Sequence, residues 1–193
     1  MKDDRLWTRA RRAAHAEIAR TAMELFLEQG FENTTIDQIV AATGISRRSF
    51  FRYFGTKEDV VLGDLAGEGA KVQEALEAVP LDVPPWEAIE EAFWRVAEQA
   101  PGDEAMRKEA EMLYGTPSLR ARSIEKHLQW QELMVPNIQR RLEAGGGDAR
   151  PPAADAIVAS AIACLDVAGQ AWIREPGSDL RELYRRAARA AGA

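Results

Sequence analysis

The sequence of 193 residues has little of what several protein classes require. It contains one cysteine, Cys164, and two histidines, so it offers no intramolecular disulfide and no cysteine-based zinc site. We therefore expect neither a metal nor a cofactor. No apolar run approaches the ~20 residues that cross a bilayer, and no apolar segment follows the charged start. We expect a cytoplasmic protein without a membrane partner.

The sequence also lacks the motifs of the common enzyme classes. It has no glycine-rich phosphate loop, no Gly-x-Ser-x-Gly turn and no His-x-x-x-His metal pair. The two histidines, His15 and His127, are far apart, and the acidic residues fall on amphipathic faces where water solvates them. The sequence therefore predicts that the protein is not an enzyme.

Helix-forming residues dominate instead, and alternation of apolar and polar residues in β-branched runs is almost absent. Proline and glycine fall between the periodic stretches, apart from Pro136, which we expect to kink or split its helix. The pattern predicts an all-α protein of about nine helices. They cover roughly residues 8–29, 35–43, 46–54, 56–79, 85–99, 103–114, 117–144, 153–174 and 178–191.

Residues 35–54 have the pattern of a helix-turn-helix. Gly44 stands between two short helical stretches, where a residue without a Cβ turns most easily. Small residues precede this turn, and an apolar seam allows the pair to pack against the first helix. The seam consists of Ile36, Ile39, Ile45, Phe50 and Phe54. In such a motif the second helix enters the major groove of DNA.

The exposed face of that second helix carries hydroxyl and guanidinium groups and no acid. These groups bind phosphates, and arginine also recognises guanine. Two flanking helices begin at Thr34-Thr35 and at Thr56-Lys57, and a helix N-terminus favours phosphate. Charge is unevenly divided as well. Residues 1–60 have ten Lys and Arg against nine Asp and Glu, a net charge of +1, whereas residues 61–193 have 15 against 22, a net charge of −7.

The first 60 residues resemble the DNA-binding domain of TetR-family transcriptional regulators. The shared motifs are Gly30-Phe31, Thr34-Thr35, Ile39, Gly44-Ile45-Ser46, Phe50-Phe51, Tyr53-Phe54 and Thr56-Lys57-Glu58. The resemblance implies phosphate contacts by Thr35, Arg47, Tyr53 and Lys57, and contacts to bases or sugars by Arg48, Ser49 and Phe51. Phe51 stands where the family commonly has tyrosine, which removes one hydroxyl contact.

Motif and resemblance together predict one set of DNA-contacting residues. They are Thr34, Thr35, Ser46, Arg47, Arg48, Ser49, Phe51, Arg52, Tyr53 and Lys57. The resemblance also divides the chain into a DNA-binding domain, residues 1–56, and a ligand-binding and dimerisation domain, residues 57–193. We accordingly expect a ligand-responsive repressor that binds an inverted-repeat operator as a homodimer. A helical small-molecule-binding or adaptor protein with a vestigial helix-turn-helix is the alternative.

Two sets of apolar residues are candidates for the roles of the second domain. The ligand-pocket candidates are Phe93, Trp94, Met112, Tyr114, His127, Trp130, Leu133 and Met134. The dimer-interface candidates are Ile157, Ala161, Cys164, Leu165, Ala168 and Trp172. On the residues alone, the pocket candidates fit an ordinary core better than a ligand site. The interface candidates fit an intrachain core and an interface equally well, and the family resemblance favours the interface.

Basic residues on both sides of the 115–117 turn suggest a class of effector. They are Arg107, Lys108, Arg120, Arg122 and Lys126. A basic rim beside an apolar cavity would suit an acyl-coenzyme A-like amphiphile with an anionic head. The alternative is that these cations are solvated or pair with neighbouring glutamates.

Overall fold

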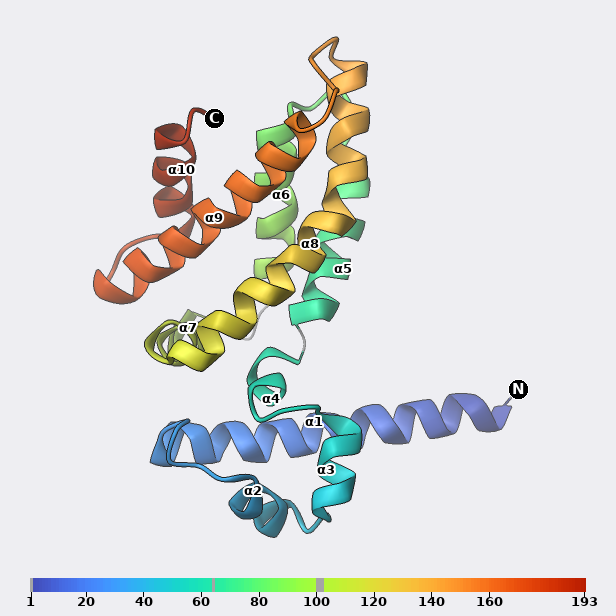
Figure 1. Cartoon of the computed structure of the whole chain (residues 1–193), viewed down its shortest axis with the longest axis vertical. Coiled ribbons are helices and arrows are strands. Elements are labelled where there is room, and N and C mark those ends of the chain that lie inside the picture. Colours follow the sequence, from blue (N-terminus) through green and yellow to red (C-terminus); the bar gives the residue numbers. More distant parts are fainter. Residues whose placement is uncertain (1, 64, 100–102) are drawn as a thin grey trace.

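The structure, a computed structural model, describes residues 2–63, 65–99 and 103–193. Within these ranges it contains ten α-helices and no β-strand, so the expected all-α class is confirmed. The helices are α1 (Lys2–Gln29), α2 (Ile36–Thr43), α3 (Arg47–Tyr53), α4 (Glu58–Leu62), α5 (Leu65–Glu77), α6 (Pro85–Ala97), α7 (Asp103–Gly115), α8 (Pro117–Ala144), α9 (Ala153–Arg174) and α10 (Leu180–Ala190). Figure 1 shows α1 lying across one end of the molecule, with α2 and α3 on its outer side and α5 to α10 on the other.

Local signals in the sequence fix the ends of the first three helices. Gly30 and Gly44 have positive φ angles of 85° and 68°, the left-handed conformation that ends a helix. Thr35 caps α2 in a reciprocal capping box with Gln38, and the Ser46 side chain accepts a hydrogen bond from the Ser49 amide at the start of α3. The predicted helix-turn-helix is therefore present with its predicted turn.

The single helix expected over 56–79 is instead two helices, α4 and α5. The capping box at its start is present, because the Thr56 amide donates to the Asp59 carboxylate and the Asp59 amide donates to Thr56 Oγ1. However, α4 ends at Leu62 and α5 begins at Leu65. Gly63 lies at this break, and glycine costs about 0.5–1 kcal/mol in a helix interior relative to alanine.

Pro136 bends α8 without splitting it. The helix runs unbroken over Pro117–Ala144 with Pro136 inside, and Figure 1 shows it changing direction along its length. Proline has no amide hydrogen for the bond to the preceding turn, so a bend at this point is expected. One part of α8 thereby packs on α5 and another reaches α4 and α7.

Two hydrophobic clusters form the core, and the chain does not divide between them at residue 56. The N-terminal cluster includes Val60 and Leu62 of α4. Leu119 of α8 is fully buried in the same cluster, and Met112 and Leu113 of α7 pack against it. The larger cluster joins α5, α6, α8, α9 and α10. Residues of the C-terminal helices therefore complete the core of the helix-turn-helix unit.

Helix α9 requires two corrections to the sequence analysis. A stretch of 18 residues within this 22-residue helix has a mean hydropathy of 1.7, so one helix of the described chain is long and apolar enough to cross a membrane, contrary to expectation. A core helix passes the same test, and α9 packs on α6, α7, α8 and α10.

The expected interface residues Ala161, Cys164, Ala168 and Trp172 are buried within the single chain. These residues belong to the intrachain core, so they do not lie on the outer face of α9, where a second chain would contact it.

The most buried ion in the described chain is the guanidinium of Arg141, at the end of α8. It is 2% exposed and donates to the carbonyls of Leu76 (2.9 Å) and Val79 (2.8 Å), to Asn137 Oδ1 (2.7 Å) and to the carbonyl of Pro80. The last carbonyls of a helix carry partial negative charge and lack partners within the helix. Arg141 therefore caps the C-terminal end of α5 and fixes the turn into α6.

Replacing Arg141 by alanine should lower the free energy of unfolding by ~3 kcal/mol, because several buried carbonyls lose a charged donor at once. Arg140→Ala is the matched control. Its guanidinium pairs with Glu77 on the surface, where an ion pair contributes ~0.5 kcal/mol. Urea unfolding of the three proteins measures the difference. Equal losses for both variants would show that Arg141 does not hold the α5–α6 turn.

Candidate DNA-binding surface and ligand cavity

The surface of α3 presents most of the predicted DNA-contacting groups to solvent. Arg47, Arg48 and Arg52 are exposed, and the Phe51 ring is 49% exposed although Phe50 beside it is fully buried. Arg47 Nε lies 3.3 Å from Asp37 Oδ1 of α2, an acid that the sequence analysis did not place there. Both side chains of this pair are more than half exposed, so a phosphate could replace Asp37 at little cost.

Four other predicted contacts lie at helix starts or within α3. Thr35 and Ser46 are exposed, and their hydroxyls serve as the caps of α2 and α3. The Ser49 hydroxyl lies 3.1 Å from that of Ser46. Tyr53 is half-buried, with the Arg52 guanidinium 5.6 Å from its ring centre. These groups border the same exposed face as the arginines.

Thr34, which the sequence analysis placed on this surface, is buried. Its side chain is 1% exposed, and its hydroxyl donates to the Gly30 carbonyl at 2.9 Å. A hydroxyl used in this way closes the loop after α1 and is not available to a phosphate. Thr34 is therefore a structural residue, and its hydroxyl is not placed to make the predicted DNA contact.

Lys57 has an intramolecular role that the sequence analysis did not foresee. Its Nζ donates to the carbonyls of Phe31 (2.7 Å) and Thr34 (3.0 Å) and lies 4.2 Å from the centre of the Phe31 ring. The ammonium therefore ties the start of α4 to the loop before α2. Lys57 positions the start of α2, whatever contact it also makes with DNA.

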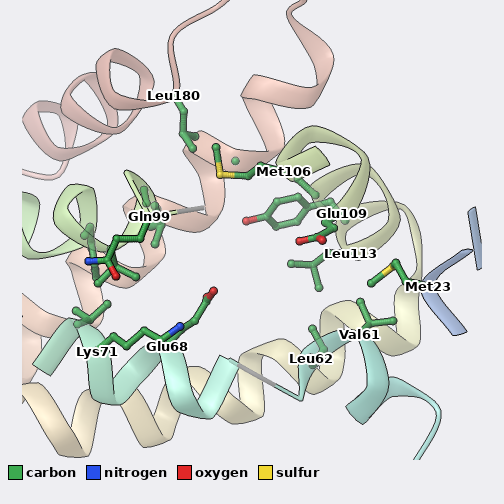
Figure 2. A pocket seen from close by; sticks show the side chains of 18 of the residues that line it. Met23, Val61, Leu62, Glu68, Lys71, Gln99, Met106, Glu109, Leu113 and Leu180 are labelled. Atoms are coloured by element: carbon green, nitrogen blue, oxygen red, sulfur yellow. The ribbon is translucent and has the colours of Figure 1, made fainter. Parts of the chain in front are cut away.

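A cavity of about 740 Å³ lies between this unit and the C-terminal helices. Its lining comes from α1 and from every helix between α4 and α10. Figure 2 shows Met23 of α1 and Val61 and Leu62 of α4 on one side, facing Glu68 and Lys71 of α5. The helix-turn-helix unit therefore supplies part of the cavity wall.

Half of the predicted pocket residues line this cavity. These four are Phe93, Trp94, Tyr114 and Trp130. The remaining four are not among its lining residues: Met112 packs on the N-terminal cluster, Met134 is fully buried in the larger core, and His127 and Leu133 lie elsewhere on α8. His127 Nδ1 is 3.3 Å from Asp166 Oδ2, and the Tyr114 hydroxyl donates to the other Asp166 oxygen at 3.4 Å.

The sequence analysis missed lining residues on helices that it assigned to other roles. Leu165 and Trp172, expected at a dimer interface, line the cavity. Two helical glycines were an available signal. A Cβ on Gly69 would lie 2.4 Å from Trp130 Cδ1, and one on Gly169 would lie 2.6 Å from the Tyr114 hydroxyl. Each glycine makes room for an aromatic ring of the cavity wall.

The basic rim expected for an anionic effector is largely used within the chain. Arg107 donates to the Trp172 carbonyl at 2.6 Å, and Lys108 pairs with Glu104. Arg122 and Lys126 point to α4 instead of to the cavity, where they meet Asp59. All four cations are thus engaged within the chain, but only Lys108 and Arg122 form the expected pairs with neighbouring glutamates, Glu104 and Glu125.

Asp59 connects α4 with α8. Its Oδ1 lies 3.3 Å from Arg122 Nε and 3.7 Å from Lys126 Nζ, and Lys126 Nζ also donates to the Leu62 carbonyl at 2.6 Å. Burial opposes ionisation of Asp59, but the Thr56 hydrogen bond and the two cations outweigh it and hold the pKa of its carboxyl below the usual value. Burial lowers the pKa of Lys126.

Comparison with known proteins identifies the family. A profile for the C-terminal domain of MftR matches residues 83–193, more than half of the chain, and a profile for bacterial regulatory proteins of the tetR family matches residues 18–63. The chain belongs to the TetR family. It is therefore a transcriptional regulator and not an enzyme, as its sequence predicted.

Two relatives show how the similarity is distributed along this TetR-family chain. The regulator MftR of Mycobacterium tuberculosis, whose name assigns it to mycofactocin biosynthesis, is 26% identical over 90% of this chain and 87% of its own. The regulator TcmR of Streptomyces glaucescens is 39% identical over 82 residues, which are 42% of this chain and only 36% of TcmR.

Solved structures share the fold at low identity. A TetR-family regulator from Syntrophomonas wolfei has a TM-score of 0.67 at 17% identity, over 94% of both chains. The repressor FadR of Thermus thermophilus, in complex with lauroyl-CoA, has a TM-score of 0.56 at 24% identity, over 91% of both chains. Both likenesses concern the fold alone.

Asp59→Asn should weaken the junction of α4 and α8 and lower the free energy of unfolding at pH 7 by ~1 kcal/mol. Since the folded-state pKa of Asp59 is below its ordinary value, its contribution is complete above about pH 4 and is lost as the pH falls through the folded-state pKa. Urea unfolding between pH 7 and pH 2.5 should therefore show wild type and variant converging in acid, while Asp37→Asn stays close to wild type throughout. A gap that does not change with pH would contradict this role.

Proposed function

We propose that this chain is a cytoplasmic, homodimeric repressor that binds an inverted-repeat operator and responds to a small-molecule effector. One observation carries the proposal: Met23 of α1 and Val61 and Leu62 of α4 line the same cavity as the C-terminal aromatic residues. A molecule in that cavity touches the unit that holds α3. Its binding can therefore favour one arrangement of α3 over another.

The exposed face of α3 supports operator binding. Arg48 and Arg52 are exposed on it and, unlike Arg47, pair with no acid in the described part of the chain. Arginine forms bidentate hydrogen bonds with guanine. An adaptor with a vestigial helix-turn-helix would have no use for this combination of free arginines and an exposed Phe51. The adaptor remains the alternative and predicts no salt-dependent DNA binding.

The outer face of α9 is the surface that we propose for dimerisation. Ala156, Ala163 and Val167 are exposed at spacings of seven and four, so they lie along one stripe, and Val167 is 52% exposed. Two such stripes related by a two-fold axis would pack as in a helical bundle. The two α3 helices would then meet half-sites one DNA turn apart, roughly 34–36 Å.

The cavity suits an effector with a long apolar part. Its wall is mostly aliphatic and aromatic, and ligand sites of this kind add only a few polar anchors. A long-chain acyl-coenzyme A is one candidate, favoured by the lauroyl-CoA complex of the similarly folded FadR. The basic rim that the sequence predicted for the coenzyme A phosphates is already bound within the chain. Its engaged members are Arg107, Lys108, Arg122 and Lys126.

Substitutions on α3 test operator binding. We expect Arg48→Ala to discriminate less between an operator selected from random DNA and its single-base variants, since a base contact carries about 1–3 kcal/mol of discrimination. Arg47→Ala should instead weaken all sites about equally and flatten the log–log salt dependence by about 1 for each protomer. Fluorescence anisotropy over a range of salt concentrations measures both effects.

Arg140→Ala, on α8 and remote from α3, is the control and should bind as wild type does. Sedimentation of the complex should give two chains for each operator. A wild-type protein that binds no DNA, or binds it without salt dependence, would overturn the proposal and favour the adaptor.

A further inference from the structure

The charges on the cavity wall are not balanced once their pairings are taken into account. The ionisable lining residues are Arg20, Glu24, Glu68, Lys71 and Glu109. Arg20 is held by Glu17 and Glu24 in two ion pairs, and this trio keeps one negative charge in excess. Glu68 and Lys71 are one helical turn apart on α5 and carry opposite charges. Glu109 of α7 adds a further acid, and no ion pair holds it in the described part of the chain.

Glu109 reaches into the cavity without a polar partner from the described part of the chain. Figure 2 shows its carboxylate turned into the open space, near Leu113 and opposite Glu68 and Lys71. Glu109 is exposed to water through the open cavity. The surrounding protein still replaces part of the hydration of its carboxyl, and this raises the pKa of the Glu109 carboxyl. A carboxylate in this environment is stabilised by any cation that enters.

The aromatic residues of the wall favour the same kind of guest. Phe93, Trp94, Tyr114, Trp130 and Trp172 all line the cavity, and aromatic faces attract cations. Two of these rings already bind arginines of the chain. The guanidinium of Arg107 lies 4.2 Å from the centre of the Trp172 ring, and that of Arg181 lies 5.8 Å from the Trp94 ring. Those two cations are themselves engaged, Arg107 by the Trp172 carbonyl and Arg181 by Glu90.

We propose that Glu109 is the polar anchor of the cavity and that the effector is an amphiphilic cation, an amine or quaternary ammonium attached to an apolar body. The apolar body occupies the space between α1, α4 and α6, and the cationic group lies between Glu109 and the aromatic rings. This inference rests on the proposed effector function of the cavity. It assigns the charge of the ligand, for which the sequence had suggested the opposite sign.

Three amphiphiles with the same twelve-carbon chain test the assignment: dodecyltrimethylammonium, laurate and dodecyl maltoside, each below its micellar concentration. Binding is followed by the fluorescence of the cavity tryptophans, with circular dichroism to verify that the fold is retained. Dodecyltrimethylammonium should bind at least tenfold more tightly than laurate. Glu109→Gln should lower its affinity about tenfold and leave dodecyl maltoside unchanged. Glu111→Gln, on the same helix but outside the cavity lining, is the matched control and should behave as wild type does.

Each other outcome overturns a distinct part of the account. If laurate binds more tightly than the ammonium, or if Glu109→Gln binds the ammonium as well as wild type does, the charge assignment is wrong. If an anionic or neutral probe also alters operator affinity, the proposed function stands without that assignment. If none of the three probes binds, the cavity is not the site of an amphiphilic effector. That result would overturn both the proposed effector function of the cavity and the proposed charge of the effector.

Discussion

The attachment of α4 to α8 is the constraint on which the rest of the structure depends. Asp59 belongs to the cap at the start of α4, and it also meets Arg122 and Lys126 of α8. Lys126 reaches the other end of the same short helix through the Leu62 carbonyl. Both ends of α4 are thereby fixed to one segment of α8, and α4 cannot move relative to it without breaking charged contacts. Trp130 of the cavity wall lies one helical turn beyond Lys126.

This attachment makes the cavity a shared element of the two units. Met23 and Leu27 of α1 line it directly, and Leu119 of α8 completes the core of the helix-turn-helix unit. Under the proposed function, an effector in the cavity contacts the helix-turn-helix unit directly as well as α7 and α8, so no long chain of intermediate residues is needed. Linkage requires the reverse as well: operator binding must change effector affinity by the same factor.

Features that depend on a few neighbouring residues were predictable from the sequence. The glycine turn at Gly44 and the caps at Thr35 and Ser46 involve groups no more than four positions apart, so their residue types are sufficient signals. Features that join distant segments were not. Nothing near Lys57 in the sequence indicates that its ammonium binds the carbonyls of Phe31 and Thr34. Likewise, the sequence of α9 does not indicate which of its alanines are buried, because that depends on how α8 and α10 pack against it.

The cavity illustrates the same limit. Large apolar residues at helical spacing identified Trp94 and Trp130, but the same pattern also selected Met134, which is ordinary core. The pairing of Arg122 with Asp59 likewise depends on the packing of α8 against α4. Composition could therefore predict that a basic cluster exists, but not that two of its members join α8 to α4.

A substitution that fills the cavity tests the central claim, that cavity and operator surface are coupled, most directly. Ala110→Phe places a large side chain at the cavity wall, whereas Ala121→Phe adds the same group to an exposed position of α8. Operator affinity of both variants, measured by anisotropy, gives the coupling without a known effector. The account predicts that Ala110→Phe changes this affinity at least ~5-fold, which is the lower end of the affinity changes typical of allosteric coupling. Ala121→Phe should leave the affinity unchanged. A folded Ala110→Phe protein that binds its operator as wild type does would contradict the claim.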